Sequence, residues 1–107
     1  MIDRIEITEQ ADHDLRGIYE YIAFELQSPD DAAGQLERLE KSIAKLGEFP
    51  EKFARYENDA WRDRDLRMML VDHFRVCYIL CKETSTITVI RVMYVGRDID
   101  EQLKNVH

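Results

Sequence analysis

The sequence lacks the features of membrane, exported and multidomain proteins. No apolar run approaches the ~20 residues that a membrane-spanning helix needs. The opening residues, MIDRIEITEQ, contain no apolar signal-peptide core, so we expect a cytoplasmic protein. Glycine and proline are scarce, with 4 and 2 residues, and the sequence shows no internal repeat, low-complexity segment or linker. A chain of 107 residues is therefore expected to form a single domain, residues 1–107.

Cysteine is also scarce, and its spacing excludes a disulfide within the chain. Cys77 and Cys81 lie four residues apart in an expected strand, which places them ~13 Å apart at ~3.3 Å per residue. A disulfide needs Cα atoms within roughly 7 Å. We expect two small, free thiols. The scattered His and Cys residues have no zinc-site spacing, so neither a metal site nor a cofactor is expected.

Basic side chains are fewer than acidic ones over the whole chain, but not in residues 60–97. The formal net charge is −7, which argues against a protein whose whole surface grips nucleic acid. Residues 1–59 carry 7 basic and 15 acidic side chains, a balance of −8. Residues 60–97 carry 7 basic and 4 acidic side chains, a balance of +3. The second half can therefore present a locally basic surface.

The first half predicts a short strand followed by two helices. Residues 2–7 alternate apolar and polar side chains, as a strand does. After Thr8, a suitable N-cap, apolar residues recur at three- and four-residue spacing and predict an amphipathic helix of about five turns. These apolar residues are Ala11, Leu15, Ile18, Tyr19, Ile22 and Leu26. Ser28 and Pro29 suit the start of a second amphipathic helix, which Gly47 ends.

The second half predicts a sheet with arginines inside its strands. Residues 66–97 predict three consecutive strands joined by turns at Asp72-His73 and at residues 83–85. Each strand carries one interior arginine: Arg67, Arg75 and Arg91. A short polar helix or tail follows from Arg97 to Asn105. The expected fold is α+β, in the order β-α-α-β-β-β, with a helical hairpin packed on a mostly antiparallel four-stranded sheet.

Several segments, taken in order, resemble one family. The opening strand is followed by ADHDLRGIYEYI and by a Pro-led second helix that ends in IAKLGEFP. The later segments are LRMMLVDHFRVCYIL and TVIRVMYVGRDI. Over nearly its whole length the chain resembles the toxins of the RelE/ParE superfamily, which belong to type II toxin–antitoxin modules.

The resemblance implies a toxin that inhibits growth until a cognate antitoxin masks it. RelE-like members cut mRNA in the ribosomal A site, ParE-like members poison DNA gyrase, and some homologues have lost evident activity. Expected partners are therefore an antitoxin and either DNA gyrase or the ribosome with its mRNA. The long helical hairpin and the sparse basic residues favour the gyrase inhibitor. The endoribonuclease and the inactive homologue stay as alternatives.

The resemblance also assigns candidate site residues. A metal-free ribonuclease needs an acid, a base and cations that face the reacting phosphate. RelE-like toxins use basic residues on the sheet and an aromatic residue or histidine near the last strand, which matches Arg67, Arg91 and Tyr94 here. Arg75 and Arg97 are candidate contacts to phosphate or to the target.

Two features leave the role of the arginines open. In a flat strand Arg91 and Tyr94 have opposite parity and face opposite sides, unless a bulge or a strand end intervenes. Asp63 and Asp65 lie beside Arg64 and Arg67 in the sequence and would partly neutralise them. The arginines can therefore form a functional basic face or a solvated face paired with acidic residues.

Overall fold

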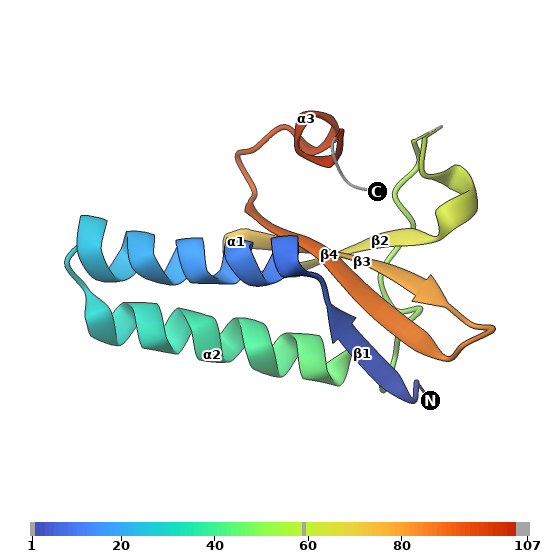
Figure 1. The fold of residues 1–107 in the computed structure, drawn as a ribbon, viewed down its shortest axis with the longest axis horizontal. Coiled ribbons are helices and arrows are strands. Elements are labelled where there is room, and N and C mark those ends of the chain that lie inside the picture. The colour runs from blue at the N-terminus through green and yellow to red at the C-terminus, as the bar shows by residue number, and fades with distance from the viewer. Residues whose placement is uncertain (1, 59, 105–107) are drawn as a thin grey trace.

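The computed structural model describes residues 2–58 and 60–104, and it confirms the expected α+β fold (Figure 1). In chain order the elements are β1 (Arg4–Ile7), α1 (Glu9–Glu20), the π-helical segment η1 (Tyr21–Glu25), α2 (Pro29–Lys45), the 3-10 helix η2 (Arg62–Arg64), β2 (Leu66–Val71), β3 (Phe74–Cys81), β4 (Thr86–Tyr94) and α3 (Ile99–Leu103). Asn105, which the sequence placed in a C-terminal helix or tail, lies outside the described residues. In the part that is described, no helix is long and apolar enough to cross a membrane.

The four strands form one sheet in the order β1-β4-β3-β2. The pairs β2–β3 and β3–β4 are antiparallel, as expected for a meander, whereas β1 lies parallel to β4. A two-residue turn joins β2 to β3, and its first residue, Asp72, has φ 55°. Aspartate tolerates this left-handed conformation better than most residues do. The edges of the sheet are therefore β1 on one side and β2 on the other.

A β-bulge interrupts the pairing of β3 with β4. Cys77 pairs with Arg91, and the next residue, Tyr78, pairs with Val89, so Ile90 is an extra residue on β4. A bulge bends its strand and re-aims the side chains beyond it. Alternation beyond the bulge places Arg91 on the face of Cys77, while Tyr94 shares the opposite face with its partner Phe74.

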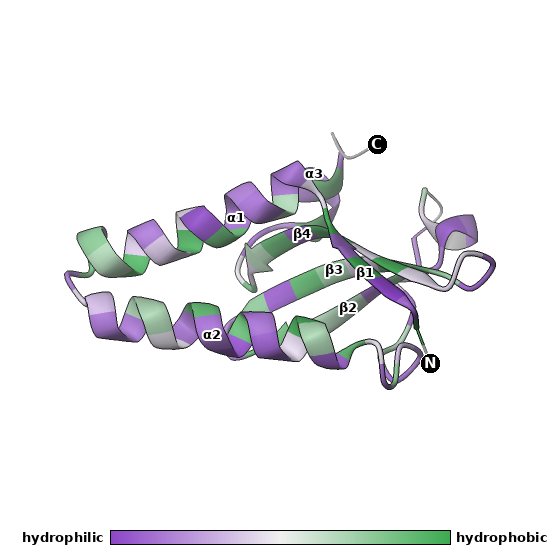
Figure 2. Cartoon of the chain, turned by 60° about the horizontal axis from the view of Figure 1, so that its bottom comes forward, coloured by the Kyte–Doolittle hydropathy of each residue, from purple (hydrophilic) through white to green (hydrophobic). Residues whose placement is uncertain are grey.

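Each face of the sheet carries its own apolar cluster. The alternation of β3 sends Val76, Tyr78 and Leu80 into the cluster that α1 and α2 cover. Cys77 points the other way, into a smaller cluster with Trp61 and Leu103. Figure 1 shows α3 and the helical hairpin on different sides of the strands, and Figure 2 shows apolar residues along the helices and strands. The second face is therefore covered, not open.

The helices begin where the sequence predicts, but the apolar stripe of the first helix does not continue to its end. Thr8 caps α1, since its Oγ1 accepts the N–H of Ala11 at 3.1 Å. The prediction that Leu26 packs on the same face as Leu15 is wrong, because Leu26 is 57% exposed. The cause is η1, where the N–H of Leu26 bonds to the carbonyl of Tyr21 at 3.1 Å, five residues back. This wider turn rotates the side chains that follow.

Candidate functional site

Arg67 lies inside the protein and holds a loop. Its side chain on β2 is among the buried charged groups, at 7% exposure. Its Nη1 donates to the carbonyls of Phe53 (2.7 Å) and Glu51 (3.2 Å), and its Nε donates to Asp65 (3.0 Å). Tyr78 fixes the same loop, because its hydroxyl donates to the carbonyl of Pro50 at 2.8 Å. These bonds hold residues 50–53 against β2 and β3.

Arg91 connects three elements of the fold. From β4 its Nε and Nη2 donate to the two carboxylate oxygens of Asp14 on α1, at 2.7 and 3.2 Å. Its Nη1 donates to the carbonyl of Gln102 on α3 at 2.8 Å. Asp14 also accepts the backbone N–H of Val92 at 2.9 Å. The two side chains are 12% and 13% exposed, so this is a largely buried ion pair with both oxygens of the carboxylate in use.

The remaining candidates are Tyr94 at the end of β4, Arg97 beyond it, and Arg75 near the start of β3. Tyr94 is 53% exposed and meets Phe74 edge to face, with ring centroids 6.1 Å apart. Arg75 is partly buried and donates from Nη1 to the carbonyl of Val95 at 2.9 Å. Arg97 is exposed.

The fold does not bring the three candidate catalytic residues into one site. Arg67 packs on the face of the sheet where Tyr78 lies, beneath the loop it holds. Arg91 points to the opposite face, toward α3. The bulge at Ile90 precedes Arg91, so regular alternation from Arg91 to Tyr94 leaves Tyr94 on the other side of the sheet. Tyr94 and Arg97 alone among the candidates are both exposed and close along the chain.

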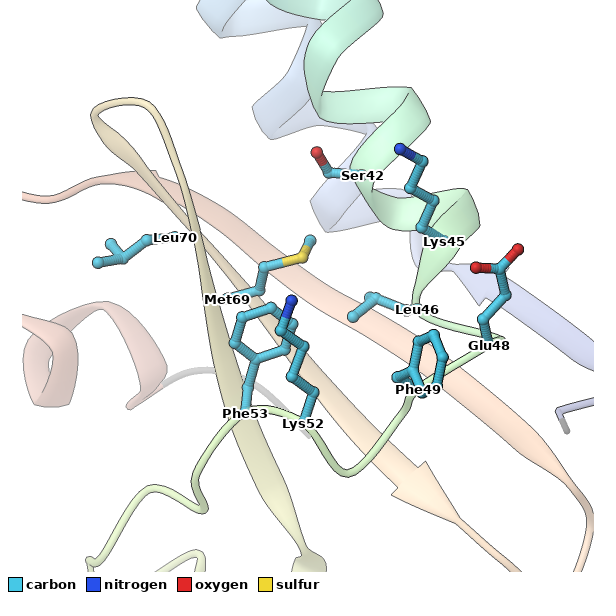
Figure 3. Close-up of a pocket in the computed structure, with 9 residues that line it drawn as sticks. All are labelled: Ser42, Lys45, Leu46, Glu48, Phe49, Lys52, Phe53, Met69 and Leu70. Atoms are coloured by element: carbon cyan, nitrogen blue, oxygen red, sulfur yellow. The ribbon is translucent and has the colours of Figure 1, made fainter.

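A hollow lies between the end of α2 and the edge strand β2 (Figure 3). Its volume is about 350 Å³, and it is lined by apolar and by polar or charged side chains from α2, β2 and the loop between them. Apolar members include Leu46, Phe49, Phe53, Met69 and Leu70, and Lys45 and Lys52 lie among them. The loop that forms one wall is the segment that Arg67 fastens, so this buried arginine shapes the hollow.

Two of the residues around this hollow face water, Phe49 and Leu70, and Figure 3 shows Leu70 pointing away from the other lining side chains, on the outer side of β2. Phe49 is 68% exposed and Leu70 is 64% exposed. Leu70 belongs to β2, which is the edge strand of the sheet on this side. An edge strand offers backbone N–H and C=O groups to an incoming strand. The loop already pairs with the start of this edge, because Arg55 bridges Arg67 and the N–H of Tyr56 donates to the carbonyl of Leu66 at 2.8 Å. Apolar side chains beside the rest of such a strand edge are typical of a surface that binds an extended segment.

The model of one protein family matches most of the chain. This family is described as the ParE toxin of the type II toxin–antitoxin system, parDE, and the match covers residues 5–99. The chain belongs to the ParE toxin family. No curated protein sequence matches it significantly.

Solved structures share the fold of this ParE-family toxin at low sequence identity. A chain from the chromosomal ParDE system of P. aeruginosa matches with a TM-score of 0.71 and 17% identity, over 88% of this chain and 97% of that one. The archaeal RelE–RelB complex from Pyrococcus horikoshii OT3 matches with a TM-score of 0.63 and 21% identity, over 92% and 100%. The isolated E. coli RelE toxin matches with a TM-score of 0.59 and 17% identity, over 92% and 89%.

The two thiols of the toxin differ in their surroundings, and both are free. Burial raises the pKa of Cys77 to about 12, so this thiol stays protonated near neutral pH and is a poor nucleophile. A hydrogen bond with Thr84 lowers the pKa of the partly exposed Cys81. Among residues 2–58 and 60–104, no group of three or more His, Cys, Asp or Glu side chains could hold a metal ion.

Sequence reasoning missed Asp14 and Gln35, the polar groups that tie the helices of the toxin to the sheet. Gln35 is buried on α2, and its Nε2 donates to Asp72 in the β2–β3 turn at 3.0 Å. Both residues follow a buried alanine, Ala11 or Ala32, by three positions and so fall on the apolar face of a helix. A polar side chain inside an apolar stripe signals a buried partner.

Proposed function

We propose that this ParE-family toxin acts in the cytoplasm by binding and inhibiting DNA gyrase, without cutting RNA. The observation that carries the proposal is that Arg67 and Arg91 bind acceptors within the protein itself. A ribonuclease needs cations aimed at the reacting phosphate. Here both guanidinium groups are largely buried and donate to carbonyls and carboxylates of the protein itself. This arrangement supports inhibition through binding.

We also propose that a cognate antitoxin occupies the hollow beside β2. An antitoxin segment that orders on binding can add a strand to the β2 edge and place apolar side chains against Phe49 and Leu70. Lys45 and Lys52 suit acidic side chains in that segment.

Two assays on the same protein test the proposal. The purified toxin is added to DNA gyrase, and supercoiling of relaxed plasmid is measured. Total mRNA is analysed by primer extension after the toxin is induced in cells. We expect loss of supercoiling and intact mRNA. Cleavage within codons, with supercoiling unaffected, would reject the gyrase proposal, and normal growth on induction without antitoxin would favour an inactive homologue.

The second candidate function is a ribosome-dependent endoribonuclease. The observation that favours it is the exposure of both Tyr94 and Arg97 just beyond the bulge of β4. In that mechanism Tyr94 would contact the 2′-hydroxyl or the leaving oxygen, and Arg75 and Arg97 would lie near the phosphate. Arg67 and Arg91 would have to leave their internal partners to act as the other catalytic residues. Tyr94→Phe is the sharpest variant, because it removes only the hydroxyl. If mRNA cleavage occurs, this variant should abolish it and leave the melting temperature unchanged.

A further inference from the structure

The end of the helical hairpin exposes three large apolar side chains. Tyr21 is 58% exposed, Phe24 is 69% exposed and Leu26 is 57% exposed. We call these three residues, together with Glu25, the hairpin tip. In Figure 1 the tip lies at the left, at one end of the longest axis of a molecule that measures 43 × 29 × 21 Å. Figure 2 shows the same end of the first helix in green, as apolar.

The π-helical segment accounts for the exposure of Leu26, whereas Tyr21 and Phe24 lie outside the apolar stripe of the first helix. Along α1 the α-helical spacing keeps Leu15 against the core. Ala23 is buried at the end of the helix, eight residues after Leu15, and Phe24 beside it faces solvent. The wider turn of η1 then leaves Leu26 exposed as well. π-Helical turns are rare and occur frequently at functional sites. The local backbone therefore presents these side chains outward.

The exposure forgoes stability that packing would provide. Burial of one Phe or Leu side chain stabilises a fold by about 1.5–3 kcal/mol. Single exposed apolar residues are common on proteins and need no explanation. Here three lie within six residues, on a projecting end of the molecule. Such a gathering is expected where another macromolecule covers the surface.

The acidic side chains around the tip indicate the chemistry of the surface that binds it. Residues 17–35 contain four acidic side chains and no Lys, Arg or His. The acidic residues are Glu20, Glu25, Asp30 and Asp31. A complementary occupant is a protein surface with an apolar pocket bordered by Lys and Arg side chains. A second copy of this chain is a poor occupant, because two tips would bring like charges together.

The tip lies far from the hollow beside β2. The two surfaces are next to opposite ends of α2, which runs from Pro29 to Lys45. A helix of 17 residues spans about 25 Å at 1.5 Å per residue. Contacts at the tip and contacts at the hollow are therefore separable by mutation.

We infer that the hairpin tip is the surface by which this toxin binds its target protein, through an apolar pocket with a basic border. The inference rests on the proposed inhibition of gyrase for the identity of the target. It leaves the hollow to the antitoxin, so the two partners occupy different ends of the hairpin.

Two phenylalanines with equal exposure give a matched test. Phe24→Ser alters the tip, and Phe49→Ser alters the hollow at a side chain of almost the same exposure, 69% against 68%. Three quantities are measured for each variant: inhibition of gyrase supercoiling, inhibition of growth on induction, and rescue of growth by the antitoxin gene. We expect Phe24→Ser to weaken supercoiling inhibition by about tenfold or more and to relieve growth inhibition. Phe49→Ser should remain toxic but lose rescue.

Further measurements separate this inference from loss of fold and from the proposed function. Both variants should melt at the wild-type temperature, because neither side chain is buried. Inhibition by the wild-type protein should weaken with added salt, and Glu25→Gln should reduce that dependence. If Phe24→Ser inhibits as strongly as wild type, or if the tip is buried between two copies in solution, the inference is overturned. If the wild-type protein blocks growth but does not inhibit gyrase, the gyrase proposal fails. In that case the growth assay tests the tip: relief of growth inhibition by Phe24→Ser supports it as the target-binding surface, and undiminished growth inhibition rejects it.

Discussion

At the scale of single residues, variants of Arg91 test whether its cation is structural or catalytic. Arg91→Ala should lower the free energy of unfolding by about 3 kcal/mol, because Asp14 would remain largely buried without its cation. Arg91→Lys should lose less, since an ammonium keeps the charge but not the two-pronged contact. Urea denaturation followed by circular dichroism measures both values. Arg97→Ala, at an exposed arginine, is the control and should change stability by less than about 0.5 kcal/mol. Unchanged stability of Arg91→Ala, with lost toxicity, would instead favour a catalytic role.

The sequence predicts that arginines lie in the strands, but not what they bind. Alternation places Arg67 and Arg91 in β2 and β4, as observed. The acceptors come from distant parts of the chain: Asp14 is 77 residues from Arg91, and the carbonyl of Phe53 lies on an irregular loop. The position of Asp14 on an apolar helix face signals a buried partner but does not identify it, because such pairs form only when the helices and the loop pack on the sheet.

At the scale of elements, local periodicity predicts the helices and strands but not their irregularities. The π-helical turn at Tyr21–Glu25 and the bulge at Ile90 each change the direction in which the side chains that follow them point. Their sequences are compatible with regular structure, so packing decides. The consequence is large in both cases, since the first exposes Leu26 and the second sets the face on which Arg91 lies.

The helix α3 is an element whose attachment can be tested alone. Asp100 on α3 accepts hydrogen bonds from the hydroxyl of Tyr56 (2.5 Å) and from Nδ2 of Asn58 (2.9 Å). Asp100→Ala should ease local opening of α3 by about 1–2 kcal/mol. Trp61, the single tryptophan, is buried in the cluster that contains Leu103. Its fluorescence should therefore shift to longer wavelength, and the amides of α3 should exchange faster.

A neighbour on the same helix provides the control for α3. Glu101 is exposed and pairs with Lys104 at 2.9 Å, which is an exposed ion pair of little energetic weight. Glu101→Ala should leave Trp61 emission as in wild type. If Asp100→Ala also leaves emission and exchange unchanged, the bonds to Tyr56 and Asn58 do not hold the helix.

At the scale of the whole molecule, the order of the elements predicts the topology because connections between successive elements are short. Two hairpins follow from turn residues between β2, β3 and β4. The helical hairpin carries the chain from β1 to β2 at the far edge of the sheet, and the meander then returns to place β4 parallel to β1. The cover over the second face was not predictable. Trp61 and Leu103 lie in segments without apolar periodicity, so their packing on the face of Cys77 becomes visible only in the folded chain.

The buried core should make the whole fold sensitive to alkali. Burial raises the pKa of Cys77 from 9.0 to about 12 and that of Tyr78 from 10.0 to about 12. Both groups ionise earlier in the unfolded chain, so the unfolded state gains stability as pH rises. The stabilising contribution is complete below about pH 9 and disappears between about pH 9 and 12. Urea midpoints at pH 7, 9, 10 and 11 should therefore fall progressively.

The two cysteines separate this effect from general alkaline damage. Cys77→Ala should be less stable at pH 7, because it leaves a cavity, yet should lose less stability between pH 9 and 11 than wild type does. Cys81 has a lowered pKa, so its contribution has the opposite sign, and Cys81→Ala should not flatten the alkaline loss. Equal alkaline slopes for Cys77→Ala and wild type would mean that the thiol of Cys77 does not titrate with unfolding. The second face of the sheet would then be open to water, contrary to its cover by Trp61 and Leu103.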